Sequence, residues 1–424
     1  MGLLIRGGRV IDPGCGLDGK FDILIEDGKI VEIIPHGKSH KSGKHQIYEA
    51  KGKVVTPGLI DIHVHLREPG HEYKETIKSG SEAAARGGFS TICCMPNTIP
   101  PNDCAAVTEL ILRKASAEAK VNVFPIGAIS KGLEGKAIAE YGDLKEAGVV
   151  AISDDGHPVA SAQLMRRAME YARAFGLTVI DHCEDPLLSA GGVVNEGLIS
   201  TLTGLKGIPA AAEESIVARD ILLAELTAAR LHIAHVSTAG SVRMIREAKA
   251  RGVPVTAEVT PNHFTLTEES VKNYDTNAKI NPPLRTKADV EALKEGLADG
   301  TIEVIASDHA PHSPAEKELE FDMAAFGISG IEVSLPLSLN LVRDKVLSLK
   351  DLVAKMTIGP ARVIGLRKGT LTVGSDADVS ILDIDREWTA DVRVFRSKGK
   401  NSPFNGSPMK GSAEVIVGGK PVKI

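Results

Sequence analysis

Short apolar runs alternate with helical stretches through most of this 424-residue chain, and that alternation limits the fold more than any other feature. Eight runs have the aliphatic composition of buried strands. They cover residues 54–61, 89–96, 121–127, 148–153, 177–182, 231–236, 253–259 and 302–308. The stretches between them, for example 74–88, 161–176, 213–230 and 241–252, are amphipathic and helix-like. Strands joined by crossover helices lie parallel, and eight such units close a TIM barrel, so we predict an α/β fold with a (β/α)8 barrel.

Both ends of the chain differ from its middle, because their β-like pieces follow one another without helices. Residues 3–12 and 21–33 form one such pair, and residues 377–384 and 413–422 form the other. Either pair alone is too small for a stable sheet. We therefore expect the two ends to combine into a small β-sandwich domain made of residues 1–55 and 366–424. The barrel, over residues 56–365, would be inserted between them.

Composition and charge exclude several classes of function. The net charge is −5 and no basic stripe is present, so no nucleic-acid partner is expected. The apolar runs are too short to span a bilayer, and we read no signal peptide at the N-terminus. Five cysteines without a C-x-x-C pair favour free thiols in a reducing cytoplasm. We interpret Cys93 and Cys94 as core residues, and His36, His40 and His45 as part of a solvated loop.

Polar residues recur where the predicted barrel strands end. In a TIM barrel the carboxyl ends of all strands meet at one rim, which is where active sites lie. Groups that are far apart in the sequence would therefore surround a single site. The residues at or just after these ends are His63, His65, Asn97, Asp154, Asp155, His182, His235 and Asp308.

The types of these residues predict a metal centre. His63 and His65 are two positions apart, so on a strand both imidazoles face the same side. The other candidate ligands are His182, His235 and Asp308. Together they exceed the three protein ligands that a single catalytic zinc usually takes, which favours two metal ions. Such a pair needs a bridging anion, and residues 148–156 contain no lysine that could be carboxylated. We predict Asp155 as the bridge, with a plain turn as the alternative.

A metal pair of this kind would carry out hydrolysis. It would form hydroxide near neutral pH and polarise a substrate carbonyl. We predict that Asp308 accepts the proton of that hydroxide and delivers it to the leaving nitrogen.

Further polar residues near the same rim suit a small anionic, amide-rich substrate, since arginine pairs bidentately with carboxylate. This predicted clamp consists of Arg67, Asn97, Asn281 and His312. Two other residues stay open. Arg285 fits a structural role as well as a substrate contact, and His309 fits a place behind the metal ligands.

At these residues the chain resembles the dihydroorotases of the cyclic amidohydrolase superfamily, over essentially its whole length. The motifs that carry the resemblance are PGLIDIHVHLREPG, GGFSTICCMPNT, SDDG, DHCED, HIAHVST, EVTPNHF, INPPLR, ASDHAPH and FGISGIE. The chain is similar to the bacterial type I branch, in which an aspartate takes the bridging place. It departs from the pattern at Asn262 and Ala325, where many relatives carry histidine and proline.

The resemblance implies zinc as the cofactor, with two ions per subunit, or one as the alternative. The implied ligands are His63, His65 and Asp308 for the first ion, His182 and His235 for the second, and Asp155 as the bridge. Asp308 is also the implied general acid and base. The implied substrate contacts are Arg67, Asn97, Asn281, His312, Phe326 and Gly327. The implied reaction is the reversible cyclisation of N-carbamoyl-L-aspartate to (S)-dihydroorotate in pyrimidine synthesis.

Two other interpretations fit parts of the pattern. A dihydropyrimidinase, hydantoinase or allantoinase shares the barrel and the H-x-H pair, but these enzymes generally resemble a pattern with a carboxylated lysine. A non-catalytic scaffold for aspartate transcarbamoylase is disfavoured, because every metal position is filled. The resemblance still raises two expectations about partners, a homo-oligomer and a complex with aspartate transcarbamoylase.

Overall fold

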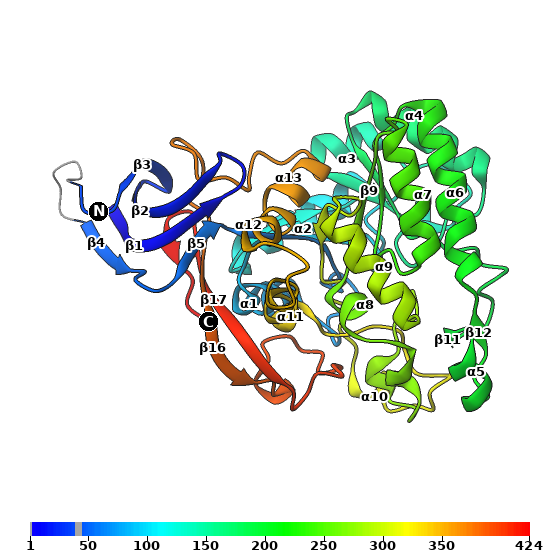
Figure 1. Cartoon of the computed structure of the whole chain (residues 1–424). Helices are drawn as coiled ribbons and strands as arrows, with labels where there is room; N and C mark the ends of the chain where they lie inside the picture. Colours follow the sequence, from blue (N-terminus) through cyan, green and yellow to red (C-terminus); the bar gives the residue numbers. More distant parts are fainter. Residues whose placement is uncertain (1, 39–44) are drawn as a thin grey trace.

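A computed structural model of the chain describes residues 2–38 and 45–424; His40, predicted above to lie in a loop, falls outside them. Figure 1 shows a group of long strands that holds both chain ends, and beside it a helix-rich part that contains the middle of the chain. Within the described ranges, no helix is both long and apolar enough to cross a membrane.

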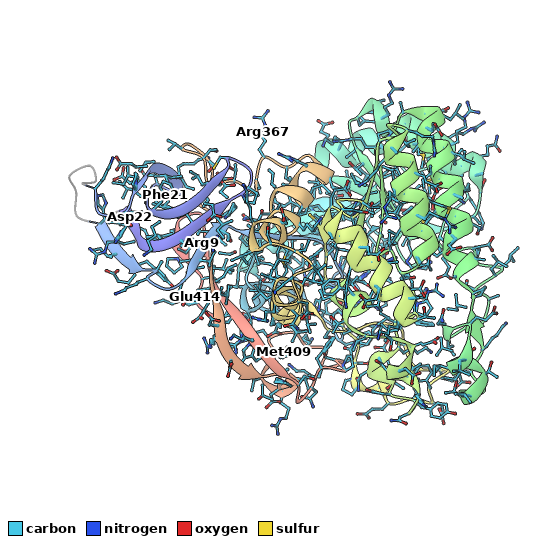
Figure 2. The ribbon with its side chains drawn as sticks, in the orientation of Figure 1. Arg9, Phe21, Asp22, Arg367, Met409 and Glu414 are labelled. Carbon is cyan, nitrogen blue, oxygen red and sulfur yellow. The ribbon has the colours of Figure 1, made fainter. Side chains whose placement is uncertain are left out.

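Strands from the two ends of the chain pair with each other, as predicted. They form one eight-stranded sheet, in which β5 lies antiparallel to β16 with Val55 opposite Ile381. An ion pair of 2.6 Å between Lys53 Nζ and Glu414 Oε1 also joins the ends, and Figure 2 labels Glu414 on β17. The strands are β1 (Gly2–Asp12), β2 (Leu17–Glu26), β3 (Lys29–Pro35), β4 (His45–Glu49), β5 (Val54–Pro57), β16 (Val379–Thr389), β17 (Pro408–Val417) and β18 (Lys420–Pro421).

The eight-stranded sheet has a hydrophobic core of its own. Side chains from both ends of the chain meet in it, among them Ile5, Ile23, Val55 and Ile381, all nearly inaccessible to solvent. His45 begins β4 rather than lying in a loop, because β4 pairs in parallel with β1 at this point.

Each of the eight predicted runs contains a strand, and these strands pair in parallel. They form sheets in the orders β6-β7-β8 and β9-β10-β13-β14-β15. Isolated parallel bridges link the two sheets: Gly127, just after β8, lies beside Ile152 of β9, and His309, after β15, lies beside Val64 of β6. The strands are β6 (Leu59–Val64), β7 (Phe89–Cys94), β8 (Asn122–Pro125), β9 (Ala151–Ser153), β10 (Thr178–Asp181), β13 (Leu231–Ile233), β14 (Val255–Val259) and β15 (Val304–Ile305).

The first run, predicted as one strand, is divided in two. Its first half is β5, in the eight-stranded sheet, and the second half begins β6. Gly58 lies at the break, where a Cβ atom would come within 2.0 Å of Ser90 Oγ, so only glycine allows the close approach of β7. β6 runs on to Val64, so His63 lies inside the strand rather than after it.

Helices cover the outside of the parallel strands, and their ends carry local signals. In α1, the Thr76 hydroxyl accepts from the Ser79 N–H at 3.1 Å, and the Ser79 hydroxyl accepts from the Thr76 N–H. The helices are α1 (Ile77–Gly87), α2 (Ala105–Glu118), α3 (Tyr141–Ala147), α4 (Ala162–Ala174), α5 (Leu198–Thr203), α6 (Ala210–Thr227), α7 (Ala239–Ala250), α8 (Pro261–Thr265), α9 (Lys287–Ala298), α10 (Pro314–Lys317), α11 (Ile331–Arg343), α12 (Leu349–Lys355) and α13 (Ile358–Ile364).

The interior between strands and helices is apolar, as the runs predicted. Cys93 and Cys94 are buried in β7, which confirms that they are core residues. Buried carboxylates within the strands are the exception. They include Asp61 and Glu258, and both lie next to the residues described below.

Candidate metal centre

The residues predicted from the sequence converge on one pocket at the carboxyl ends of the parallel strands. The pocket has a volume of about 640 Å³ and opens to solvent. Of the twelve predicted site residues, eleven line it, and the remaining one, His63, is fully buried beside them. The lining residues are His65, Arg67, Asn97, Asp155, Gly156, His182, His235, Asn281, Asp308, Ala310, His312, Phe326 and Gly327.

The two histidines of the H-x-H pair both face Asp308. Asp308 Oδ1 lies 3.1 Å from His65 Nε2 and 3.6 Å from His63 Nε2. The three groups offer ligand atoms that all lie within 4.8 Å of one another. This spacing is close enough for one cation to touch all three.

Asp155 lies in the middle of four imidazoles. Its Oδ1 is 3.3 Å from His63 Nε2, 3.4 Å from His235 Nε2 and 3.7 Å from His182 Nδ1. Its Oδ2 is 3.5 Å from His65 Nε2. The two carboxylate oxygens therefore face different histidines, an arrangement that suits an anion lying between two cations.

Two atoms at the centre of this cluster have no hydrogen-bond partner in the described part of the chain. They are His63 Nε2 and Asp155 Oδ1, and both are buried. Buried polar atoms are nearly always paired, so two unpaired atoms side by side require an explanation. Imidazole nitrogens and carboxylate oxygens are the ligands that zinc and similar divalent cations take in proteins. The residues therefore fit a metal ion.

The charges of the carboxylates agree with that fit. Burial alone would raise the pKa of Asp155, but the facing imidazoles, His63 foremost, outweigh burial and hold the pKa well below its usual range. Burial likewise opposes the ionised form of Asp308, and the His65 and His63 imidazoles again lower its pKa. Both groups are therefore anionic at neutral pH, as metal binding requires.

Behind the imidazoles lies a second layer of polar groups, most of which sequence analysis missed. Glu258 Oε1 lies 2.5 Å from His63 Nδ1, Asn97 Oδ1 lies 2.9 Å from His65 Nδ1, and Glu184 Oε2 lies 3.2 Å from His182 Nε2. Each contact occupies one ring nitrogen and leaves the other directed at Asp155 or Asp308. Such partners orient metal-binding histidines and raise their basicity. A carboxylate in an otherwise apolar run was the available signal for Glu258.

The neighbouring Asp154 points away from the cluster. Its Oδ1 accepts from the Ile129 N–H at 2.7 Å and the Ser130 N–H at 3.0 Å, so it anchors the segment that follows β8. Burial raises the pKa of Asp154 to about 6, against the opposing effect of those hydrogen bonds. The two adjacent aspartates thus have different surroundings, and only Asp155 faces the histidines.

Three residues of the site have left-handed backbone conformations. The φ angles are +59° at Arg67, +30° at His235 and +44° at Asp308. Such conformations cost free energy for residues other than glycine, and they persist where the surrounding structure holds them. Such grouping at one pocket is typical of functional sites.

Arg67 and His312 lie together in the lining of the pocket. Arg67 Nη2 is 3.2 Å from His312 Nε2, and Arg67 Nε donates to the Pro311 carbonyl at 3.3 Å. Burial first, and then the adjacent guanidinium, lower the pKa of His312 to about 2, so its ring is neutral. Asn281 Nδ2 donates to Glu184, and Asn281 Oδ1 has no hydrogen-bond partner in the described chain. This wall combines a cation with neutral polar groups.

Phe326 and Gly327 are held in the wall by two buried lysines that the sequence did not reveal. Lys279 Nζ donates to the carbonyls of Phe321, Asp322 and Ala324 at 2.7–3.0 Å and lies 4.4 Å from the centre of the Phe326 ring. Lys317 Nζ donates to the carbonyls of Ala325 and Gly327 at 2.7 and 3.2 Å. Ammonium groups replace water for five carbonyls of this segment and fix its path.

A residue of the C-terminal segment, Asn401, completes this support. Its Nδ2 donates to the carbonyls of Ala310 and Gly327 at 3.1 and 2.9 Å, and its Oδ1 accepts from the His312 N–H at 3.0 Å. One buried amide therefore fixes three residues of the pocket rim. The far end of the sequence thus contributes directly to the site.

The two residues left open by the sequence have other surroundings. Arg285 donates to Ser237 Oγ at 3.1 Å, to Asn195 Oδ1 at 2.8 Å and to the Ile208 carbonyl at 2.9 Å, and it does not line the pocket. His309 is buried 3.4 Å from Glu75 Oε2, and its carbonyl accepts from the His65 N–H. Both side chains support the frame around the pocket.

Similarity to known proteins extends over the whole chain. Residues 52–241 match the family described as dihydro-orotase-like, and residues 218–423 match the amidohydrolase family. A dihydroorotase from Geobacter metallireducens is 57% identical over 425 residues, covering 100% of this chain and 99% of its own. One from Pelotomaculum thermopropionicum is 57% identical over 424 residues, covering 100% and 98%. Among solved structures, the L-hydantoinase (dihydropyrimidinase) from Arthrobacter aurescens has a TM-score of 0.89 at 29% identity, covering 99% of this chain and 95% of its own.

Proposed function

The chain belongs to the dihydroorotase family of amidohydrolases, and from that premise we propose which of its residues perform the family's reaction. It is a hydrolase of cyclic amide bonds that interconverts (S)-dihydroorotate and N-carbamoyl-L-aspartate. The observation that carries the assignment is the similarity over the full chain, at 57% identity, to curated dihydroorotases. The rest of the proposal concerns the metal, the proton carrier and the substrate contacts.

We propose zinc as the metal, with two ions per subunit. His63, His65 and Asp308 would hold one ion, and the ligands of the other would be His182 and His235. Asp155 would bridge the ions, which is supported by the way its two oxygens face different histidines. A bound pair of such cations acidifies water and polarises a carbonyl group.

The chain's own groups would then move the proton and hold the ring. Asp308 is anionic and faces the pocket, so it can accept a proton from water and return it to the ring nitrogen as the amide bond breaks. The Arg67 guanidinium would pair with the substrate carboxylate, next to the neutral His312. We propose Asn97, Asn281, Phe326 and Gly327 as the remaining contacts. Asn97 already bonds to His65, so its amide would also position that ligand.

Metal content measured alongside activity tests the metal proposal. Purified enzyme should contain close to two zinc ions per chain, and a chelator should remove both metal and activity, with activity restored by added zinc. Full activity at one zinc per chain would replace the two-ion proposal by the one-ion alternative. Full activity without metal would remove it altogether.

The rival assignment is a hydantoinase or dihydropyrimidinase, because solved structures of that kind share this fold. Hydantoin and dihydrouracil lack the carboxylate that Arg67 would bind. We therefore expect the enzyme to hydrolyse dihydroorotate at least about a hundredfold faster than either. Arg67→Gln should lower kcat/KM for dihydroorotate by roughly that factor and leave slow turnover of dihydrouracil almost unchanged. The opposite ranking of substrates in the unmodified enzyme would overturn the assignment.

We also propose that the eight parallel strands form one closed barrel. The two isolated bridges between the three-stranded and five-stranded sheets support closure, because they join the segment after β8 to β9 and the segment after β15 to β6. The shared core of the eight-stranded sheet supports a sheet folded over itself as a β-sandwich. On this view residues 1–55 and 366–424 form the small domain and 56–365 the barrel.

Partners and location are proposals drawn from the family. We propose that the protein is a homo-oligomer, as the family suggests. We also propose that it works in a reducing cytoplasm, because its five cysteines are all free. A complex with aspartate transcarbamoylase is the further proposal raised by the family. The mass of the enzyme alone, and of its mixture with that protein, tests both. A monomer would refute the first proposal, and two separate species would refute the second.

A further inference from the structure

One helix, α6, contacts three of the segments that carry predicted metal ligands. It packs against α4 and α7, beside which Figure 1 shows it. Residues of α6 bond to the chain shortly after Asp155, after His182 and after His235. These are the bridge and the two histidines proposed for the second ion. The ligands proposed for the first ion alone make no hydrogen bond or ion pair with α6 within residues 2–38 and 45–424.

Arg219, in the middle of α6, holds the segment that begins with Asp155. Arg219 Nη1 donates to the carbonyls of residues 159 and 160 at 2.6 and 3.3 Å. At the start of the segment, Asn97 Nδ2 donates to the Asp155 carbonyl at 3.3 Å. Residues 156–157 lie between these contacts and are exposed. Two polar side chains therefore fix the two ends of a segment that borders the metal pocket.

A buried acidic pair holds Arg219 in turn. Asp220 Oδ1 accepts from Arg219 Nε at 2.8 Å, and Asp181 Oδ2 lies 3.8 Å from Arg219 Nη2. Both carboxylates are nearly inaccessible to solvent, so they need the charge that the guanidinium supplies. Asp181 is the last residue of β10 and immediately precedes His182. One buried ionic cluster therefore joins the end of β10 to the segment after β9.

Glu213, in the first turn of α6, makes a comparable contact near His235. Glu213 Oε1 accepts from the N–H groups of Ser237 and Thr238 at 3.1 and 3.2 Å, and the Ser237 hydroxyl donates to Oε2. His235 lies two residues before Ser237 and has a φ of +30°. A residue other than glycine keeps such a backbone only where its surroundings hold it. The bonds to Glu213 are part of that support.

We propose, on the basis of the two-ion site, that α6 is the frame of the second ion and that Arg219 and Glu213 are its positioning residues. Arg219 keeps Asp155 between the imidazoles by holding the chain beside it, and Glu213 does the same for His235. Neither side chain lines the metal pocket, so both act through the ligands rather than on the substrate. Polar groups that orient metal ligands change metal affinity by about 10–100-fold.

Arg219→Lys tests the proposal, because it keeps the charge beside Asp220 while a lysine lacks the fork that also reaches both carbonyls. Zinc is titrated into the metal-free, full-length enzyme against a chromophoric chelator, which gives an affinity for each ion. We expect the affinity for the second ion to fall about tenfold or more, and that for the first ion to change less than about threefold. The ion lost in His182→Ala identifies the second site.

Hydrogen exchange of the metal-free enzyme gives a readout that does not depend on zinc. The amides of residues 156–160 should exchange about tenfold faster in Arg219→Lys, and those of β6 at an unchanged rate. Glu213→Gln should weaken the same ion without changing exchange in residues 156–160. This second variant also tests the frame if Arg219→Lys does not fold.

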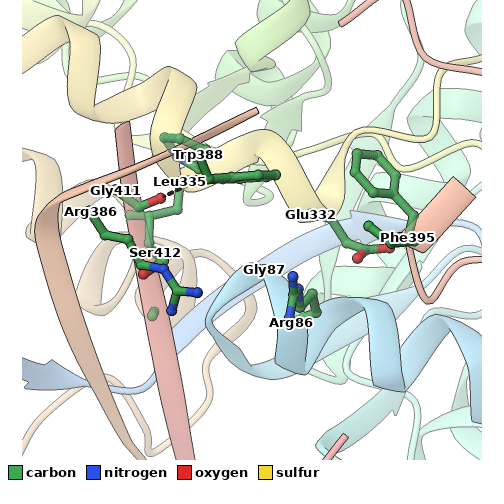
Figure 3. A pocket seen from close by; sticks show the side chains of 12 residues that line it. Arg86, Gly87, Glu332, Leu335, Arg386, Trp388, Phe395, Gly411 and Ser412 are labelled. Atoms are coloured by element: carbon green, nitrogen blue, oxygen red, sulfur yellow. Dashed lines mark hydrogen bonds between the residues drawn. The ribbon is translucent and has the colours of Figure 1, made fainter. Parts of the chain in front are cut away.

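Arg173→Lys is the matched control. Arg173 Nη1 donates to the Thr227 carbonyl at 3.0 Å, so the bond joins α4 to α6 but reaches none of the three ligand segments. Both zinc affinities should stay within about twofold. Trp388 is the only tryptophan, and its Nε1 donates to the Gly411 carbonyl in the eight-stranded sheet, as Figure 3 shows. Its emission therefore reports global unfolding and shows whether each variant is folded.

Three outcomes separate this proposal from the two-ion site itself. Unchanged affinity for both ions in Arg219→Lys and Glu213→Gln, or an equal loss in Arg173→Lys, would overturn the frame. Unchanged exchange in residues 156–160 would overturn the role of Arg219. A single ion in the unmodified enzyme would instead contradict the two-ion site, and the exchange rates would then decide whether Arg219 holds the segment.

Discussion

Replacing the buried lysine behind the pocket wall tests whether that wall is built for substrate binding. Lys279 donates to three carbonyls of the segment 321–324 and lies against the Phe326 ring. Lys279→Met keeps the length and apolar part of the side chain but removes all three donors. Phe326 and Gly327 are then free to shift, so we expect both stability and substrate affinity to fall.

The size of the effect follows from two opposing contributions. Each carbonyl left without a donor costs about 1–3 kcal/mol, or roughly 6 kcal/mol for three. Burial lowers the pKa of Lys279 from 10.5 to about 8, so holding the ammonium in the protein costs roughly 3 kcal/mol, which methionine avoids. The net loss in the free energy of unfolding should therefore be about 3 kcal/mol. We expect KM for dihydroorotate to rise about tenfold and kcat to change much less.

Lys355→Met is the matched control. Lys355 is also buried, with a pKa lowered by burial, but its Nζ donates to a single carbonyl, that of Ile302, away from the pocket. Its loss should cost about 1 kcal/mol or less, with unchanged KM. Denaturant unfolding and steady-state kinetics on both variants give the comparison. If Lys279→Met lowers stability while KM stays within about twofold, the lysine holds the fold and not the substrate wall. An equal rise in KM for Lys355→Met would likewise refute the reasoning.

Three further changes probe other parts of the molecule. Asp308→Asn should keep the melting temperature but lower kcat by about 10²-fold or more, because it removes the proton carrier. Near-normal turnover would rule out that role. Gly327→Ala should lower the free energy of unfolding by about 2–4 kcal/mol and raise KM, because its Cβ would lie 2.6 Å from the Ala310 carbonyl and 2.9 Å from His312. The control Gly374→Ala is also at positive φ but in open space, so it should cost only about 1 kcal/mol. The pKa of Glu332 is raised from 4.5 to about 7, so the folded state binds more protons between these values and stability falls as pH rises through them. The free energy of unfolding of Glu332→Gln should therefore equal that of the unmodified protein at about pH 4.5 and exceed it by roughly 3 kcal/mol at about pH 8. Equal unfolding curves for the two proteins at both pH values would show that burial does not destabilise this carboxyl.

The strands and the position of the site could be predicted because both depend on local patterns and on topology. Apolar runs of four to eight residues lead to parallel strands when helices connect them, and all eight runs contain a strand. Parallel strands share one carboxyl edge, so polar residues at their ends had to meet. This is why the sequence alone assigns His63 and Asp308, 245 positions apart, to one site.

The supporting residues could not be predicted in the same way, because the same pattern has more than one outcome. Glu258 and Glu303 each stand in an apolar run. Glu258 reaches His63 and His232 inside the strands, whereas Glu303 bonds to Lys249 and to the Ala257 N–H. Which of the two supports the site depends on the facing side chains, and those are set by tertiary structure.

Long-range polar contacts were missed for a related reason. Asn401 belongs to a terminal segment that the pattern assigned to the small domain, yet its amide holds His312 and Gly327 at the pocket rim. No periodicity in residues 395–405 indicates that this segment turns towards the metal pocket. The division of the first run at Gly58 was missed too, because it depends on how closely β7 approaches.

The metal pocket brings two unpaired buried polar atoms together, since His63 Nε2 lies 3.3 Å from Asp155 Oδ1. Buried groups such as Asp154, Arg285 and Lys279 each donate or accept several hydrogen bonds, so their burial is compensated within the chain. The metal pocket instead keeps His63 Nε2 and Asp155 Oδ1 without hydrogen-bond partners in the described ranges. A stable protein can retain such atoms where a ligand supplies the missing partner. A cation at Asp155 would supply that partner, because it can bind the carboxylate oxygen and the facing imidazole nitrogen together.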